Sequence, residues 1–360
     1  MRVMCVRGER MKTTMKYMSA AILSVAAATM ATSHVAAQDV AAFYKSTPLQ
    51  IVVGYGPGGG YDAYARVIAR HIGKRIPGTP NVIVQNMPGA ASMKSANYIY
   101  AIAPKDGSQI ATFSRGLPMQ PLLDNQGVQF DALKLGWIGS AAAETSVTFA
   151  WAGTGFTTFE DVRQKEMLVS ASGAGADSAT FPWIMNAVLG TKFRVITGYP
   201  DANSTMIAIE RGEAQGSAGT SWGSLTSGRA DWLSKNRIVI LAQLGLQSNP
   251  AIGNAPLIVD LAKNAADRQV LEMIFARQSF AYPYTAPPGL PPERLAALRT
   301  AFNATMKDAD FNADATKMGL EVSPITGEEM SALLDKLYKT PADVIARARA
   351  AIEAGKATAK

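Results

Sequence analysis

The sequence predicts an α/β protein built from two units, each a mostly parallel sheet flanked by helices. Three observations predict this fold class. Short β-branched strand patterns alternate with longer helical patterns, turn residues separate them, and the alternation starts twice along the chain. Roughly 320 residues follow an N-terminal leader, which is more than one hydrophobic core usually organises. We therefore expect two domains.

The first unit starts at residue 49 and the second at residue 166. Turn sequences such as Pro77-Gly78-Thr79-Pro80 stand between the elements. The first unit is expected to contain strands at 49–53, 81–85 and 109–113 and helices at 62–76 and 90–103. The second unit is expected to contain strands at 166–171, 193–196 and 238–244 and helices at 178–189 and 202–211.

Two further segments connect the units. Residues 135–150 form an extended, Ser/Ala/Thr-rich stretch suited to a crossover, and 277–284 is strand-like and precedes a helical tail at 291–306. The simplest place for this tail to dock is the first unit, so two crossings form a hinge. The predicted domains are discontinuous: residues 40–143 plus 276–360, and residues 144–275.

The N-terminus has the layout of a signal peptide. Five basic residues precede or flank the start of an uncharged apolar run, Met18–Met30, and small residues at 35–37 follow it. The run is shorter than the roughly 20 apolar residues that span a bilayer. We expect residues 1–37 to be cleaved and the protein to reach the periplasm.

Removing residues 1–37 changes the composition. Five basic residues and one acidic residue leave, so the net charge falls from +7 to about +3, and no Lys/Arg-rich block remains. We exclude nucleic acid as a partner. Cys5 and His34 leave too, so His71 is the one histidine and no cysteine remains. Thiol nucleophiles and His/Cys metal clusters are excluded, and we expect no enzyme activity, no cofactor and no metal.

A glycine-rich loop between the first strand and the first helix is the clearest candidate site. Its backbone amides are uncovered, and at a helix N-terminus they favour anions. It also satisfies G-x-G-x-x-G, but no acidic residue occurs from Ala63 to Lys105 to hold a dinucleotide's ribose. The candidate ligand-binding residues are Tyr55, Gly56, Pro57, Gly58, Gly59, Gly60, Tyr61 and Asp62, with Asp62 as a candidate N-cap.

A matching loop follows the first strand of the second unit. Ligands of open α/β sheets bind beyond the carboxyl ends of strands, so the two loops should face each other across a cleft. The candidate residues here are Ser172, Gly173, Ala174, Gly175, Ala176, Asp177 and Ser178.

Other loops that follow strands add candidates. Arg115 could hold a carboxylate through two hydrogen bonds, could be a solvated loop residue, or could form a salt bridge to the other domain. Tyr55 and Trp222 are suited to pack on an aromatic or aliphatic ligand. The remaining candidates are Ser114, Tyr199, Ala202, Thr220 and Ser221.

The ordered motifs resemble the Bug-type substrate-binding proteins of tripartite tricarboxylate transporters. The family's opening turn is similar to Pro57–Asp62 followed by Ala65-Arg66, and its N-x-P-G-A-G-G segment to Asn86–Ser92. Its second glycine loop looks like 172–177, and its proline-rich tail motif like Pro287–Arg294. The chain departs from the pattern at Ala91-Ser92, which replaces a glycine pair, and at Ala176-Asp177-Ser178.

The resemblance implies a periplasmic-binding-protein (Venus-flytrap) fold, type II-like, with two crossover strands as hinge. It implies a receptor, expected to be a monomer, that captures a dicarboxylate, tricarboxylate or aromatic carboxylate and delivers it to membrane transporter subunits. Two alternatives stay open: a ligand-sensing subunit of a membrane signalling system, and an exported enzyme on the same fold.

Overall fold

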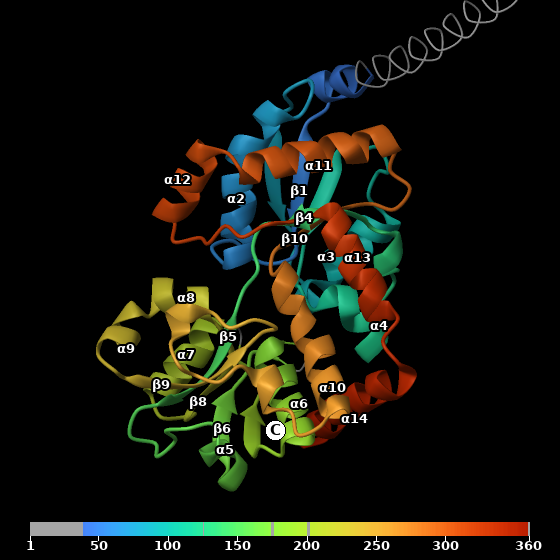
Figure 1. Cartoon of the computed structure of the whole chain (residues 1–360). Helices are drawn as coiled ribbons and strands as arrows, with labels where there is room; N and C mark the ends of the chain where they lie inside the picture. The colour runs from blue at the N-terminus through green and yellow to red at the C-terminus, as the bar shows by residue number, and fades with distance from the viewer. Residues whose placement is uncertain (1–38, 125, 174–175, 200–201, 359–360) are drawn as a thin grey trace, which may run out of the picture.

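The computed structural model describes residues 39–358 apart from 125, 174–175 and 200–201. The predicted signal peptide therefore lies outside the described residues. The chain forms two α/β lobes, one above the other in Figure 1. The first lobe contains the blue, cyan and most of the orange and red segments, and the second contains the green and yellow ones.

The sheet of the first lobe has six strands in the order β11-β4-β10-β3-β1-β2. Strand β1 pairs in parallel with β2 and β3, whereas β10 is antiparallel to both β3 and β4. Its strands are β1 (Leu49–Val53), β2 (Val82–Asn86), β3 (Gln109–Thr112), β4 (Gly136–Ser140), β10 (Pro283–Ala286) and β11 (Ile325–Thr326). Its helices are α2 (Gly60–Ile72), α3 (Met93–Ala101), α4 (Gln120–Leu123), α11 (Pro292–Met306), α12 (Ala309–Lys317) and α13 (Gly327–Tyr338).

The sheet of the second lobe has five strands in the order β7-β6-β8-β5-β9. Strand β6 pairs in parallel with β7 and β8, and β5 is antiparallel to both β8 and β9. Its strands are β5 (Ser146–Trp151), β6 (Met167–Ser170), β7 (Phe193–Ile196), β8 (Gly216–Ser221) and β9 (Ile238–Leu244). Its helices are α5 (Asp161–Gln164), α6 (Asp177–Leu189), α7 (Ala202–Glu210), α8 (Trp222–Gly228), α9 (Ala230–Ser234) and α10 (Ala265–Phe275).

Apart from β11, both sheets have one topology. Read from one edge, the order is β2-β1-β3-β10-β4 in the first sheet and β7-β6-β8-β5-β9 in the second. The fourth strand in each order, β10 or β5, is antiparallel to its neighbours. In each sheet the antiparallel strand, β10 or β5, is the one that the chain enters after crossing from the other lobe. This arrangement confirms the predicted two-lobe α/β fold with two crossings between the lobes, but both sheets are mixed rather than mostly parallel, because each crossing adds an antiparallel strand.

The expected elements agree with the structure where the pattern is local, and fail at the return crossing. Residues 135–150 contain two strands, β4 and β5, with the crossing between them. The strand expected at 277–284 is wrong, because Ala276–Phe280 forms a 3-10 helix that continues from α10, and β10 begins only at Pro283. The Arg277 side chain supports this helical turn by donating from Nε to the carbonyl of Ile274 at 3.0 Å.

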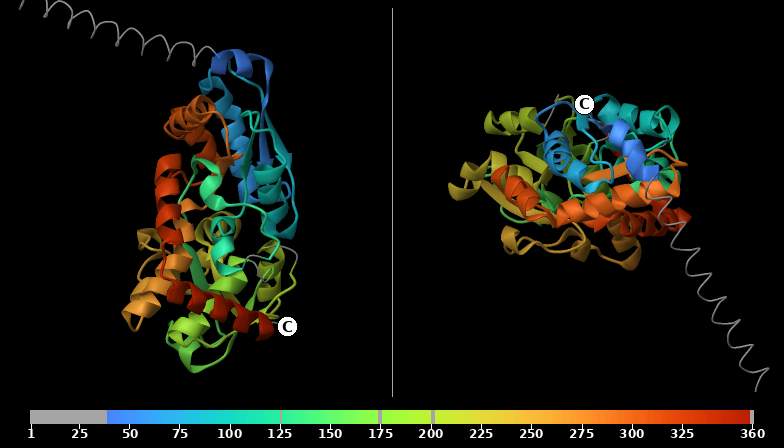
Figure 2. Two further views of the ribbon diagram at one scale, coloured as in Figure 1. Left: turned by 90° about the vertical axis from the view of Figure 1, so that its right-hand side faces the viewer. Right: turned by 90° about the horizontal axis from the view of Figure 1, so that it is seen from above.

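The last helix, α14 (Ala342–Thr358), makes a third connection between the lobes. It packs on α6 and α10 of the second lobe, and its Val344 and Ile352 share a buried apolar cluster with Phe181 of α6. Figure 2 shows it running along the second lobe, away from the blue strands. The predicted domain limits, 40–143 plus 276–360 and 144–275, stay a prediction. They assign α14 to the first domain, although it packs on helices of the second lobe.

Candidate functional site

A cavity of about 810 Å³ lies between the lobes. Its walls come from the loops that follow β1, β2 and β3 in the first lobe, and from the loop before α6 and the end of β8 in the second. The crossing residues contribute Glu144 and Tyr282. This position beyond the carboxyl ends of parallel strands is where open α/β sheets bind ligands.

The first glycine loop is held in place by a buried carboxylate. Asp62, 3% exposed, accepts hydrogen bonds from the Gly58 amide at 2.9 Å, from Arg66 Nε at 2.8 Å and from Asn86 Nδ2 at 2.9 Å. Burial by itself would raise the pKa of Asp62, but these donors together outweigh burial and lower it. The expected N-cap role is wrong: Gly59 is the N-cap of α2, and Asp62 in the first turn fastens the loop to β2.

Close approach explains the first glycine of this loop. A Cβ on Gly54 would lie 2.5 Å from Ser95 Oγ and 2.6 Å from Ser92 Cβ. Ser92 Oγ instead donates to the Gly54 carbonyl at 3.1 Å. The glycine therefore allows the loop after β1 to pack directly on the loop after β2.

The loop after β2 is strained where it lines the cavity. Ala90, Ala91 and Ser92 have φ angles of 46°, 51° and 77°, in the left-handed region that favours glycine. Ala91 and Ser92 occupy the two positions where the resembled family has its glycine pair. Such strain persists mostly at functional sites. The segment lines the cleft cavity, and the candidates predicted from the sequence did not include it.

Three tyrosines form an aromatic wall. Tyr55 and Tyr61 stack with ring centroids 4.7 Å apart, and Tyr282 lies 5.1 Å from Tyr61. The Tyr61 hydroxyl accepts a hydrogen bond from the Arg115 amide at 3.0 Å. Tyr282 precedes β10 in the return crossing, so this wall joins the first glycine loop to the hinge.

Arg115 links the two lobes. Its Nε donates to Asp177 Oδ2 at 2.8 Å, its Nη1 pairs with Glu144, and its Nη2 donates to Ser146 Oγ at 3.3 Å. Arg277 Nη1 binds the other Asp177 oxygen at 3.1 Å. Of the roles expected for Arg115, the structure shows the salt bridge to the other lobe.

Burial and the neighbouring charges shift the pKa values of the two carboxyl groups in this cluster in opposite directions. Burial alone would raise the pKa of Asp177, but the charges of Arg115 and Arg277 outweigh it and hold that pKa below its ordinary value. Burial raises the pKa of Glu144, Asp177 and Glu321 act in the same direction, and Arg115 opposes them. Asp177 therefore keeps its negative charge, whereas Glu144 takes up a proton more readily than an exposed glutamate.

The structure brings together about half of the predicted ligand-binding residues. Among the described residues, the cleft cavity is lined by Tyr55, Gly60, Tyr61, Ser114, Arg115, Ser172, Gly173, Ala176, Asp177 and Ser221. A neighbouring cavity of about 210 Å³ is lined by Gly58, Gly59, Gly60 and Trp222. Neither cavity is lined by Gly56, Pro57, Asp62, Ser178, Tyr199, Ala202 or Thr220. Ala174 and Gly175 lie outside the described residues. A ligand-binding role for all these residues stays a prediction.

Sequence reasoning did not place Glu144, Tyr282 or Arg277 at the site. They belong to the two crossings, and no local pattern links them to the glycine loops. Tyr199 was predicted from the sequence but lines neither cavity. Its hydroxyl bonds to Glu213 at a distance of 3.2 Å. The position of a residue at a lobe crossing was the one signal that could have pointed to the first three.

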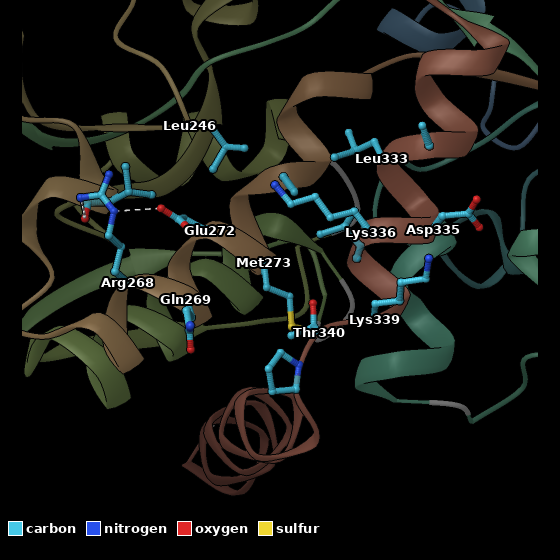
Figure 3. A pocket seen from close by; sticks show the side chains of 15 residues that line it. Leu246, Arg268, Gln269, Glu272, Met273, Leu333, Asp335, Lys336, Lys339 and Thr340 are labelled. Atoms are coloured by element: carbon cyan, nitrogen blue, oxygen red, sulfur yellow. Dashed lines mark hydrogen bonds and ion pairs between the residues drawn. The ribbon is translucent and has the colours of Figure 1, made fainter.

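A second cavity of about 840 Å³ opens between α10 and α13 (Figure 3). Its walls combine apolar side chains such as Met273 and Leu333 with the Arg268–Glu272 ion pair. It contains none of the loop residues described above. The two volumes are nearly equal, so chemistry distinguishes them: the cleft cavity has glycine-loop amides and hydroxyls from both lobes.

The part of the chain that the structure describes contains no cluster of His, Cys, Asp and Glu suited to a metal ion. Among the same residues, no helix has both the length and the apolar character needed to cross a bilayer.

Comparison with known proteins identifies relatives of this fold. No family model matches the chain. The UPF0065 protein of the tcbD–tcbE intergenic region of Pseudomonas sp. strain P51 is 38% identical over 96 residues, which is 27% of each chain. The chain thus matches about a quarter of the length of this curated relative.

Solved structures extend the likeness to most of the chain. A TctC solute-binding protein from Polaromonas has a TM-score of 0.62 at 19% identity, covering 84% of this chain and 99% of that one. The periplasmic binding protein BugD has a TM-score of 0.63 at 19% identity, covering 84% and 98%. This chain has the periplasmic-binding-protein fold. These two structures share the fold with this chain, and the 38% identity to the UPF0065 protein is limited to 96 residues.

Two further structures with this fold carry small dicarboxylates. One R. palustris protein was solved with adipate and has a TM-score of 0.64 at 15% identity, covering 84% of this chain and 97% of that one. MatC from Rhodopseudomonas palustris was solved with bound malate and has a TM-score of 0.62 at 14% identity, covering 85% and 99%.

Proposed function

We propose that this protein is a periplasmic solute-binding protein that captures a small carboxylate in the cleft between its lobes and delivers it to a tripartite tricarboxylate-type membrane transporter. The observation that carries the proposal is the cleft cavity, which is lined by residues of both glycine loops. The adipate-bound and malate-bound neighbours support a carboxylate as the ligand.

The groups around the cavity suit an anion that is bound and released unchanged. Gly60 and Tyr61 begin α2, and Asp177 begins α6, so amides at two helix N-termini lie near the cavity. Ser114, Ser172 and Ser221 add hydroxyl groups from both lobes. Because the mature chain has one histidine, His71, and this residue pairs with Asp314 on α12 at 2.9 Å, no histidine stands beside these serines as a base.

Ligand binding should favour the closed arrangement of the lobes. Both walls contribute groups, so a carboxylate makes its full set of contacts only when the lobes are together, and differential binding shifts the population toward that state. The transporter would then receive the closed form. The N-terminal leader supports export to the periplasm, with cleavage of residues 1–37.

The experiment is a thermal-shift panel on the mature chain, starting at Gln38, with small mono-, di- and tricarboxylates and the amide of each as an uncharged control. A carboxylate present at 100 times its Kd should stabilise the folded protein by about 2.7 kcal/mol, and its amide should not. Mass spectrometry of the protein and of the recovered ligand completes the test. Absence of any stabilising carboxylate, or chemical conversion of one that binds, would overturn the proposal.

A further inference from the structure

The cationic group in the cleft is already neutralised by the protein itself. Each side-chain nitrogen of Arg115 donates to a protein oxygen: Nε to Asp177, Nη1 to Glu144 and Nη2 to Ser146. Arg115 is 9% exposed, so it has little surface left for a ligand. A bidentate grip on an incoming carboxylate would require Arg115 to release one of these partners.

The second arginine behind the cluster does not change this balance. Arg277 is 3% exposed and donates from Nη1 to Asp177 at 3.1 Å and from Nε to the Ile274 carbonyl at 3.0 Å. It does not line the cleft cavity, whereas Asp177 and Glu144 do. Two positive and two negative side chains therefore make up the cluster. Asp177, Glu144 and Arg115 line the cavity, and Arg115 is the one positive group among these three.

A second carboxylate on the ligand would meet this negative side. Like charges a few ångströms apart repel strongly where water is largely excluded. The two described arginines of the cluster, Arg115 and Arg277, are both already bonded to Asp177. A ligand with one carboxylate avoids the repulsion, since amides and hydroxyls of the loops can hold it. Its remainder can then face Tyr55 and Tyr61 as an apolar or hydrogen-bond-donating group.

We propose that Asp177 and Glu144 make this receptor selective for ligands with a single carboxylate and a neutral remainder, against dicarboxylates and tricarboxylates. This inference rests on the proposed function and names the ligand class of the same cleft. Asp177 also belongs to the segment 176–178, where the chain departs from the second glycine loop of the family it resembles. The selectivity thus comes from negative groups that repel the wrong ligand.

The test compares matched ligand pairs by calorimetry: hexanoate with adipate, butanoate with succinate, and benzoate with terephthalate. The wild-type protein should bind the monocarboxylate of the preferred pair at least tenfold more tightly than the dicarboxylate. Asp177→Asn should reduce this ratio by tenfold or more. The ratio is the useful quantity because loss of the Arg115–Asp177 bond between the lobes weakens binding of both members together.

Two further variants make the result decisive. Glu144→Gln removes the other negative charge while Asp177 still pairs with both arginines, so it should also reduce the ratio if Asp177→Asn folds poorly. Asp260→Asn, at an exposed carboxylate of the second lobe, should leave the ratio at the wild-type value. Tighter binding of the dicarboxylate by the wild type, or an unchanged ratio in both cleft variants, would overturn the inference alone. If no carboxylate of either class binds any form, the proposed function itself fails.

Discussion

The two glycine loops look alike in sequence, but their aspartates have different roles. Asp62 of the first loop bonds within its own lobe, to Gly58, Arg66 and Asn86. Asp177 of the second loop bonds to Arg115 of the first lobe and to Arg277 of the return crossing. One carboxylate shapes a loop, and the other joins the lobes and carries negative charge into the cavity.

The difference shows that the sequence of a glycine-rich loop before a helix does not determine which charged groups surround its aspartate. Both aspartates are in the first turn of a helix, where negative charge is favoured by the dipole. What separates them is the set of cations that tertiary structure brings near. For the first loop that cation is Arg66, one helical turn away, and for the second it is Arg115, which is distant in the chain.

The largest expected effect comes from breaking the first loop. Asp62→Ala removes a buried acceptor from three donors and should lower the free energy of unfolding by about 1–3 kcal/mol. Carboxylate affinity should fall as well, because the loop carries Tyr55 and Tyr61. Urea denaturation and calorimetry measure the two quantities.

The matched control for Asp62 is Asp161→Ala. Asp161 also holds a loop through backbone amides, those of Thr157 and Thr158 at 2.8 and 2.9 Å, but it lies in the second lobe and lines neither cavity of the cleft. This variant should lose stability and keep its affinity. Equal loss of affinity in both variants would show that the first loop has no special part in binding.

An intermediate effect is expected from pH. Protonation of Glu144 removes a negative charge from the cavity wall, and burial raises the pKa of this residue above its ordinary value of 4.5. Carboxylate affinity should therefore increase as the pH falls from neutral toward the raised pKa of Glu144. The groups facing Glu144 are Arg115, Asp177 and Glu321, together with Tyr64 and Tyr282.

Glu144→Gln provides the comparison for the pH experiment. The variant lacks the titrating group, so its affinity should stay nearly constant over the same range. Calorimetry at three pH values distinguishes the two profiles. If wild-type affinity does not change with pH, or if Glu144→Gln shows the same pH dependence as the wild type, Glu144 does not control carboxylate affinity.

The smallest expected effect tests the contact between the first loop and the hinge. A Cβ on Gly60 would lie 3.2 Å from the Tyr282 hydroxyl, whereas a Cβ on Gly59 would meet no atom within 4 Å. Gly60→Ala should displace Tyr282 and weaken carboxylate binding a few-fold, and Gly59→Ala should leave it unchanged. The measurement is the dissociation constant of the carboxylate for each variant. Equal values would show that Tyr282 does not contribute to carboxylate binding.

Much of the fold could be predicted because it depends on local pattern. The strands at 49–53, 193–196 and 238–244 agree with β1, β7 and β9 residue for residue, since runs of β-branched and apolar residues favour strands wherever they are placed. The segment 276–280 shows the limit. It overlaps the strand expected at 277–284, but continuity with α10 and burial of Arg277 make it helical.

The glycine loops and their place after strands were visible in the sequence, because backbone geometry at a strand-to-helix turn is a short-range property. The partners of Arg115 were not. Asp177 is 62 residues away and Glu144 is 29, and Arg277 is 100 residues from Asp177. The sequence by itself determined two α/β units with a glycine loop each. Only the tertiary structure decided which charges meet between them, because that pairing depends on two lobes and three chain connections packing together.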